Sequence, residues 1–105
     1  MDRYGRTVLI VTGSITARPD SIDAVLALSL AHVHRSRLEP GCLLHSVQID
    51  AEDRLRLVFI EQWADADALR AHFRVPASGA FVTEASGLAS SPPEMTIYDA
   101  EVAKF

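Results

Sequence analysis

The sequence contains a single cysteine, Cys42, and fewer basic than acidic residues. One cysteine excludes an internal disulfide, so a reducing, cytoplasmic compartment is the simplest expectation. Ten Lys and Arg residues against 14 Asp and Glu give a net charge of -4, which offers no basic field to attract nucleic-acid phosphates. The longest apolar stretch, residues 24–33, is interrupted by Ser29 and His32 and is shorter than the ~20 residues that span a bilayer. We therefore expect neither a nucleic-acid nor a membrane partner.

Metal and nucleotide motifs are also absent from the sequence. No His-Glu-x-x-His, no Cys-x-x-Cys and no carboxylate cluster with ligand spacing occurs. His32 and His34 are two residues apart on a predicted helix, so they point about 200° apart and do not form a metal pair. There is no Gly-x-Gly-x-x-Gly motif and no Walker loop. The sequence therefore predicts no metal, flavin or nucleotide cofactor.

The chain of 105 residues is expected to form one domain, residues 1–105. It is 49% hydrophobic, with a mean hydropathy of +0.13. A small domain leaves about a third of its surface exposed, so this apolar content is more than a lone domain needs. We expect part of the apolar surface to meet a partner.

Hydrophobic periodicity predicts a β-α-β-β-α-β order of elements. Apolar positions at three- and four-residue spacing predict a helix over 21–38, which Pro40 and Gly41 end. Val75 and Pro76 split the second helical region into 65–73 and 77–89, with Asp65 as the cap. The strands are predicted at 8–15, 42–49, 55–63 and 95–98.

The third predicted strand is apolar in the middle of both faces. One side carries Leu57, Phe59 and Glu61, and the other carries Val58 and Ile60, whereas a strand with one wet face alternates. The element order is that of the ferredoxin-like α+β fold, in which helices cover one face of a four-stranded antiparallel sheet. The other face is left bare, so we expect a homodimer that pairs the sheet faces about a twofold axis.

Three polar or aromatic side chains are candidates for chemistry. His72 lies on or beside the buried side of its helix, where an imidazole can accept a proton from a phenol; a partly exposed packing histidine is the alternative. Trp63 ends the third strand and is either a stacking surface for a planar ligand or a core residue. Glu61, flanked by Phe59 and Trp63, needs a partner or a raised pKa.

The alternative role for Glu61 is structural. An ion pair with Arg35, Arg37 or Arg74 would also satisfy a buried carboxylate. His45 lies on the second strand, and its role is left open.

Three segments of the sequence resemble the antibiotic biosynthesis monooxygenase (ABM) family. They are residues 39–43 (EPGCL), residues 61–63 (E-x-W) and residues 68–72 (A-L-x-x-H), followed by the aromatic Phe81. The resemblance implies a dimeric α+β barrel. It further implies a cofactor-independent monooxygenase that oxidises a small aromatic quinol, phenol or polyketide-like substrate with O2.

The same resemblance implies roles for individual residues. His72 would be the base, Glu61 an orienting group and Trp63 an aromatic wall, which are the catalytic candidates. The substrate-binding candidates are Phe59, His45, Phe73 and Phe81. His45 stands where related proteins often carry a tyrosine.

Two other functions are weighed against the monooxygenase. The haem-degrading branch of the superfamily resembles this chain at Trp63, but it uses an asparagine on the first strand, and this sequence has no asparagine. His72 also lies earlier than the haem-ligating histidine of that branch. The second alternative is a non-catalytic dimeric module that binds a small aromatic ligand.

Overall fold

The computed structural model describes residues 7–105, so the first six residues of the predicted domain lie outside the described part. The element order is the predicted one, with the second helical region split as expected. The elements are β1 (Thr7–Thr16), α1 (Ile22–Ser36), β2 (Cys42–Asp50), β3 (Asp53–Trp63), α2 (Ala66–Arg74), α3 (Pro76–Leu88) and β4 (Glu94–Glu101).

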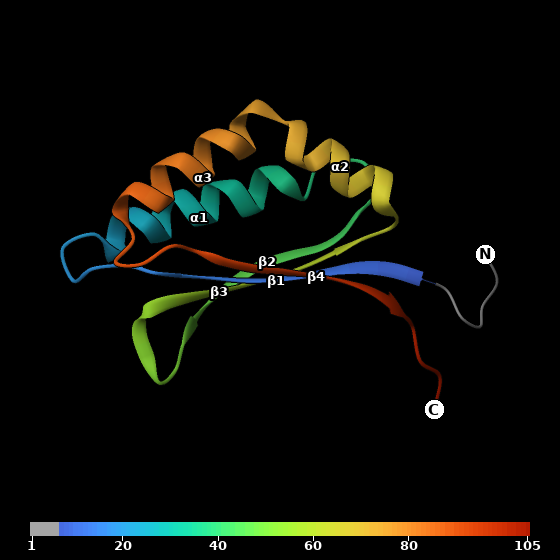
Figure 1. Ribbon diagram of the computed structural model, residues 1–105, viewed down its shortest axis with the longest axis horizontal. Coiled ribbons are helices and arrows are strands. Elements are labelled where there is room, and N and C mark those ends of the chain that lie inside the picture. Colours follow the sequence, from blue (N-terminus) through green and yellow to red (C-terminus); the bar gives the residue numbers. More distant parts are fainter. Residues whose placement is uncertain (1–6) are drawn as a thin grey trace.

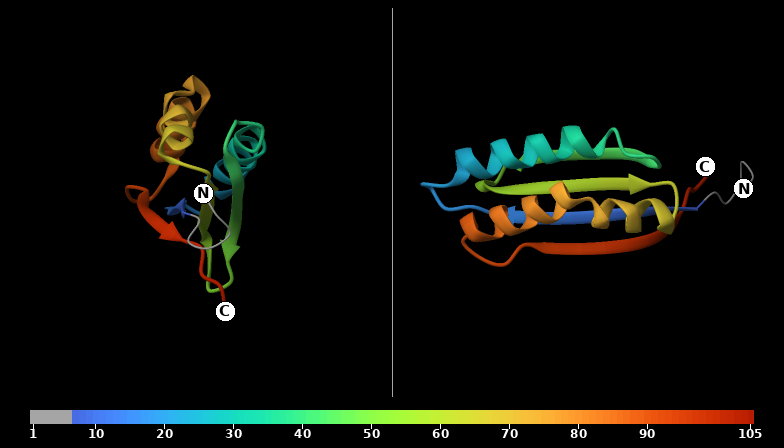
Figure 2. Two further views of the ribbon diagram at one scale, coloured as in Figure 1. Left: turned by 90° about the vertical axis from the view of Figure 1, so that its right-hand side faces the viewer. Right: turned by 90° about the horizontal axis from the view of Figure 1, so that it is seen from above.

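The strands form one antiparallel sheet in the order β2-β3-β1-β4. The three helices lie together on one face of this sheet, and no helix of residues 7–105 covers the other face (Figure 1). Seen from above, α1 runs over the β2 side of the sheet, and α2 and α3 run over the β1 and β4 side (Figure 2). The ferredoxin-like α+β fold predicted from the sequence is confirmed.

The core divides into two apolar clusters. The larger one contains Val25, Leu57 and Phe59, and the smaller one contains Val11, Trp63 and Leu69. Along β3 the buried side chains alternate, as expected for a strand with one face under the helices. Glu61 falls between Phe59 of one cluster and Trp63 of the other. The sheet therefore presents a carboxylate where the apolar core is interrupted.

Local signals set the ends of the helices. The Asp65 side chain accepts a hydrogen bond from the Ala68 N–H at 2.8 Å, which is the predicted cap of α2. Pro76 stands in the first turn of α3, where its missing N–H is not needed. Gly41 has a φ of 80°, the one positive φ among residues 7–105. The turn at Gly41 thus directs β2 away from the end of α1.

The last strand is longer than predicted. Residues 95–98 were expected, but β4 spans Glu94–Glu101 because it pairs with β1 from Ser14 to Thr7. Backbone pairing with a central strand extends β4 through polar residues that have weak strand preference on their own.

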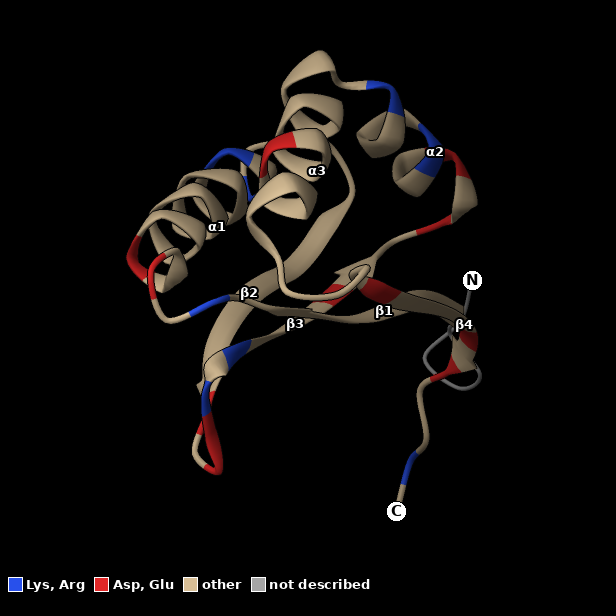
Figure 3. Cartoon of the chain, turned by 60° about the vertical axis from the view of Figure 1, so that its left-hand side comes forward, with Lys and Arg blue, Asp and Glu red and all other residues tan. Residues whose placement is uncertain are grey.

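The face without helices carries exposed apolar side chains. Leu44, Ile60 and Tyr98 are between 37% and 51% exposed there. Charged residues of both signs are interspersed over the helices and the β2-β3 hairpin, with no continuous basic face in residues 7–105 (Figure 3). None of the helices described is both long and apolar enough to cross a membrane.

Candidate functional site

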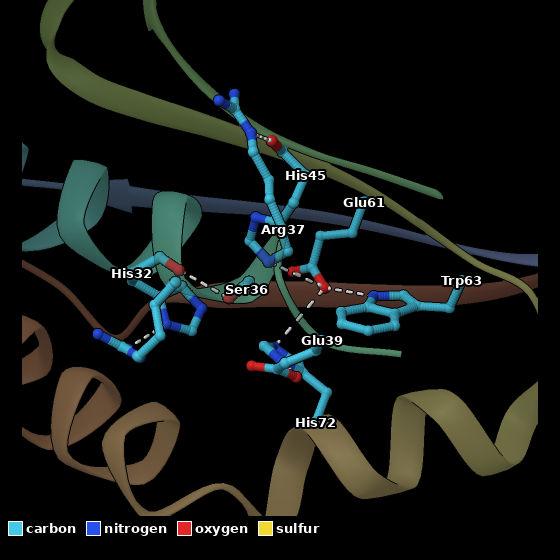
Figure 4. A network of polar contacts seen from close by, with 9 residues as sticks. His32, Ser36, Arg37, Glu39, His45, Glu61, Trp63 and His72 are labelled. Atoms are coloured by element: carbon cyan, nitrogen blue, oxygen red, sulfur yellow. Dashed lines mark hydrogen bonds and ion pairs between the residues drawn. The ribbon is translucent and has the colours of Figure 1, made fainter. Parts of the chain in front are cut away.

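Glu61 is held at the centre of a buried polar cluster. Its Oε1 accepts a hydrogen bond of 2.8 Å from the indole Nε1–H of Trp63, two residues along the same strand. Trp63 is fully buried, so the indole is fixed by packing and in turn fixes the carboxylate. Glu61 points at two imidazoles from other elements, His45 and His72 (Figure 4).

His72 is brought to the cluster by α2. Its Nδ1 lies 2.8 Å from Oε1 of Glu39, and its Nε2 lies 4.0 Å from Oε1 of Glu61. A carboxylate only accepts hydrogen bonds when ionised, so the proton is on Nδ1 when the ring is neutral, and the Nε2 lone pair faces Glu61. Glu39 therefore selects the tautomer of His72.

His45 reaches the cluster from β2 and is 2% exposed. Its Nε2 lies 3.4 Å from Oε1 of Glu61, within ion-pair distance but without hydrogen-bond geometry. Among the described residues, its Nδ1 has no hydrogen-bond partner either. Arg37 fixes the backbone next to it by donating from Nε to the His45 carbonyl at 2.9 Å. The imidazole of His45 is thus buried without a hydrogen bond on either nitrogen, and its Nε2 faces the Glu61 carboxylate.

His32 completes the cluster from α1. Its ring stacks on Phe81 of α3 with centroids 4.2 Å apart and planes 7° apart. Its Nδ1 lies 3.0 Å from Nη2 of Arg35, which also donates to the Ala77 carbonyl at 3.2 Å. Arg35 has no acceptor atoms, so Nδ1 of His32 accepts this bond.

The environment shifts the pKa values of two members. Burial, followed by the charges of His45, His72 and Arg35, lowers the pKa of His32 to about 3, and Glu61 opposes this only weakly. Burial raises the pKa of Glu61, but its interactions with His45, Trp63 and His72 outweigh burial and hold the pKa below its usual value. At neutral pH the cluster therefore contains a neutral His32 and an ionised Glu61.

A cavity of about 350 Å³ opens beside the cluster, between the sheet and the helices. Its volume lies at the lower end of the range for small-molecule pockets. Most of its wall is apolar, and His32, Glu61 and His72 contribute polar groups where the cavity meets the cluster. The principal lining residues are Val11, Phe59, Glu61, His72, Phe73 and Phe81. The cavity therefore offers mainly apolar walls beside the polar groups of the cluster.

Comparison with known proteins assigns the family. The family model described as "Antibiotic biosynthesis monooxygenase" matches residues 8–84. The chain belongs to the ABM family. A solved structure described as an antibiotic biosynthesis monooxygenase is 30% identical, with a TM-score of 0.81 over 88% of this chain and 97% of that one.

Two further relatives come from named organisms. This chain is similar to Rv0793 from Mycobacterium tuberculosis at 25% identity, with a TM-score of 0.84 over 92% of this chain and 97% of that one. An uncharacterised Synechocystis protein, sll1783, is 34% identical over 90 residues, which cover 86% of this chain. The match spans 61% of the length of sll1783, so that protein is longer than the shared domain.

The candidate residues predicted from the sequence fall into two groups. Glu61, His72, Phe59, Phe73 and Phe81 line the cavity. His45 and Trp63 are not among the lining residues and instead contact Glu61 from behind. Their assigned roles stay predictions.

The arginine pairing considered for Glu61 is wrong. The polar partners of Glu61 in residues 7–105 are Trp63, His45 and His72. Arg35 and Arg37 instead bind a histidine side chain and backbone carbonyls. These contacts direct both guanidinium groups to His32 and to the backbone instead of to the Glu61 carboxylate.

Sequence reasoning missed two members of this ABM site. His32 was weighed only as a metal pair with His34. It precedes the buried Val33 and is itself 5% exposed. Glu39 was read as part of a turn motif, and its contact with His72, 33 residues later, has no sequence signal. Both become visible only when α1 and α2 are placed over the same sheet.

Proposed function

We propose that this protein is a cofactor-independent monooxygenase that oxidises a small aromatic quinol, phenol or polyketide-like substrate with O2. The observation that carries the proposal is the hydrogen-bonded pair Glu39–His72 at the wall of an apolar cavity. A histidine oriented by a carboxylate is a competent general base. Membership of the ABM family supports the same class of reaction.

In the proposed reaction His72 accepts the acidic proton of the bound substrate at Nε2. The positive charge that develops on the ring is stabilised by Glu39 at 2.8 Å and by Glu61 at 4.0 Å. The apolar walls, including Phe59 and Phe81, exclude water and hold the aromatic rings.

The electron-rich substrate anion then reduces O2. For an anthrone, the ring methylene becomes a carbonyl, one oxygen atom of O2 enters the product and the other leaves as water. The four electrons come from the substrate C–H bonds, so the overall reaction balances without a separate reductant.

We further propose that the working form is a homodimer that pairs the open sheet faces. Leu44, Ile60 and Tyr98 on this face are 38%, 37% and 51% exposed. Apolar side chains gathered on an open sheet are typical of a protein interface. Sedimentation equilibrium tests this: Ile60→Lys should convert a dimer into a monomer, and a monomeric wild-type protein would refute the assembly.

Oxygen consumption tests the reaction. Metal-stripped protein is mixed with a panel of quinols and anthrones in an oxygen electrode, with rates corrected for autoxidation. His72→Ala should abolish the excess uptake, and His34→Ala is the matched control because His34 is exposed on α1. Binding is followed in parallel by the fluorescence of Trp63, the single tryptophan.

The outcomes separate catalysis from binding. Uptake above the blank that is lost in His72→Ala and kept in His34→Ala supports the monooxygenase. Ligand binding without uptake contradicts it and favours the non-catalytic module that binds a small aromatic compound. Equal oxygen uptake by His72→Ala and wild type would show that His72 takes no part in the reaction.

A further inference from the structure

We infer that His32, His45 and His72 form a binding site for a divalent transition-metal ion of the Zn²⁺ type, with Glu61 as the fourth ligand. The three imidazoles come from α1, β2 and α2 and are all buried. One ring nitrogen from each lies within 4.8 Å of the other two. This inference is tested without oxygenation, and the proposed oxygenation belongs to the metal-free form, because Nε2 of His72 cannot accept a proton while it binds an ion.

The distances are close to those of a bound ion. Atoms at the corners of a 4.8 Å triangle lie about 2.8 Å from its centre, and Zn–N bonds are about 2.0–2.1 Å, so each nitrogen moves by about 0.7 Å or less. Oε1 of Glu61 lies 3.4 Å from His45 Nε2, near the separation of two tetrahedral ligands, and 4.0 Å from His72 Nε2. Figure 4 shows these side chains converging from different elements.

His45 is the strongest single indication of a ligand. A buried polar atom normally finds a hydrogen-bond partner. Both ring nitrogens of His45 lack one within residues 7–105, although the residue is only 2% exposed. Its Nε2 faces Glu61. A metal ion at the centre of the cluster would satisfy this nitrogen.

His72 already has the arrangement of a metal-binding histidine. Its Nδ1–H donates to Glu39, which leaves Nε2 free, and an outer carboxylate of this kind orients histidine ligands in metalloproteins. The other oxygen of Glu39, Oε2, is buried without a partner. Glu39 and Glu61 place two carboxylates beside the three imidazoles, and their charge would favour a bound cation. Three imidazole ligands suit zinc, copper and nickel better than calcium, which takes oxygen ligands.

Arg35 opposes metal binding through His32. Its Nη2 donates to Nδ1 of His32 at 3.0 Å. If Nδ1 binds the metal, this hydrogen bond is lost; if Nε2 binds it, Nδ1 must carry the proton and can no longer accept. Arg35 must therefore turn away when the ion enters. This predicts that replacing Arg35 by a hydrogen-bond acceptor strengthens binding.

The test is titration of untagged, metal-stripped protein with Zn²⁺ by calorimetry, and with Co²⁺ by visible absorption. We expect one ion per chain and an intense tetrahedral Co²⁺ spectrum. His45→Gln should weaken Zn²⁺ binding at least tenfold, and Glu39→Gln about 10-fold or more by loss of the outer carboxylate. His34→Gln is the matched control and should bind as wild type. Arg35→Gln should bind several-fold more tightly.

The results decide the inference without any activity measurement. Absence of micromolar Zn²⁺ binding, or binding that His45→Gln leaves unchanged, overturns it. If circular dichroism shows that His45→Gln does not fold, the Co²⁺ spectrum of the wild type and the Zn²⁺ affinity of Arg35→Gln decide the inference. An octahedral Co²⁺ spectrum, or weaker Zn²⁺ binding by Arg35→Gln, contradicts the ligand set.

Discussion

Gly41 offers a sharp test of how the turn before β2 supports the site. Its φ of 80° is in the left-handed region, which costs a residue with a Cβ about 1–2 kcal/mol. A Cβ built there would lie 2.5 Å from the Cβ of Ala68 on α2, and overpacking of this kind costs about 1–3 kcal/mol. Gly41→Ala should therefore lower the free energy of unfolding by about 2–5 kcal/mol.

The assay is urea unfolding followed by Trp63 fluorescence and circular dichroism. The double variant Gly41→Ala/Ala68→Gly removes the close contact, so the two substitutions should be coupled by about 1–3 kcal/mol in a double-mutant cycle. Gly79→Ala is the matched control, because a Cβ there meets nothing within 4 Å. It should be neutral or up to about 1 kcal/mol stabilising. A neutral Gly41→Ala, or no coupling with Ala68→Gly, would refute the reasoning.

Three further predictions concern the cluster and its supports. Because the pKa of His32 falls from 6.5 to about 3 on folding, the unfolded chain binds more protons between these values. The free energy of unfolding of the metal-free protein should therefore fall by up to about 2 kcal/mol from pH 7 to pH 5, or by about 1 kcal/mol after solvent screening. In urea titrations, His32→Gln should remove this dependence of the unfolding free energy on pH. Glu39→Gln should lower kcat about tenfold or more with little change in KM, because the developing charge on His72 loses its nearest carboxylate; equal kinetics would remove Glu39 from this role. Asp65→Ala should cost about 1 kcal/mol in urea unfolding by loss of the α2 cap. Asp67→Ala should cost less, because it removes only an exposed ion pair with Arg70 in the same helix.

The fold was predictable because its signals are local. The buried stripe of α1 and the inward side chains of β3 follow simple periods, and both are confirmed. Asp65 marks the start of α2 by its side-chain cap, and Pro76 marks the start of α3 by its missing N–H. The length of β4 was underestimated because its pairing with β1, rather than its own composition, extends it.

The site was only partly predictable because its contacts are distant in sequence. Glu61 and Trp63 share a strand, so their proximity follows from the pleat. The contacts of His72 with Glu39 and of His32 with Phe81 join different elements. Their geometry depends on how α1, α2 and α3 pack over the sheet, which no residue spacing reveals.

The central claim is that the cavity beside His72 inserts an oxygen atom from O2 into an aromatic substrate. The most direct measurement is turnover of an anthrone or quinol by metal-stripped protein under ¹⁸O2, with mass spectrometry of the product. The account predicts one ¹⁸O atom in the product and the other in water, with incorporation above the uncatalysed blank and lost in His72→Ala. Label incorporation no greater than the blank, or equal in His72→Ala, would contradict it.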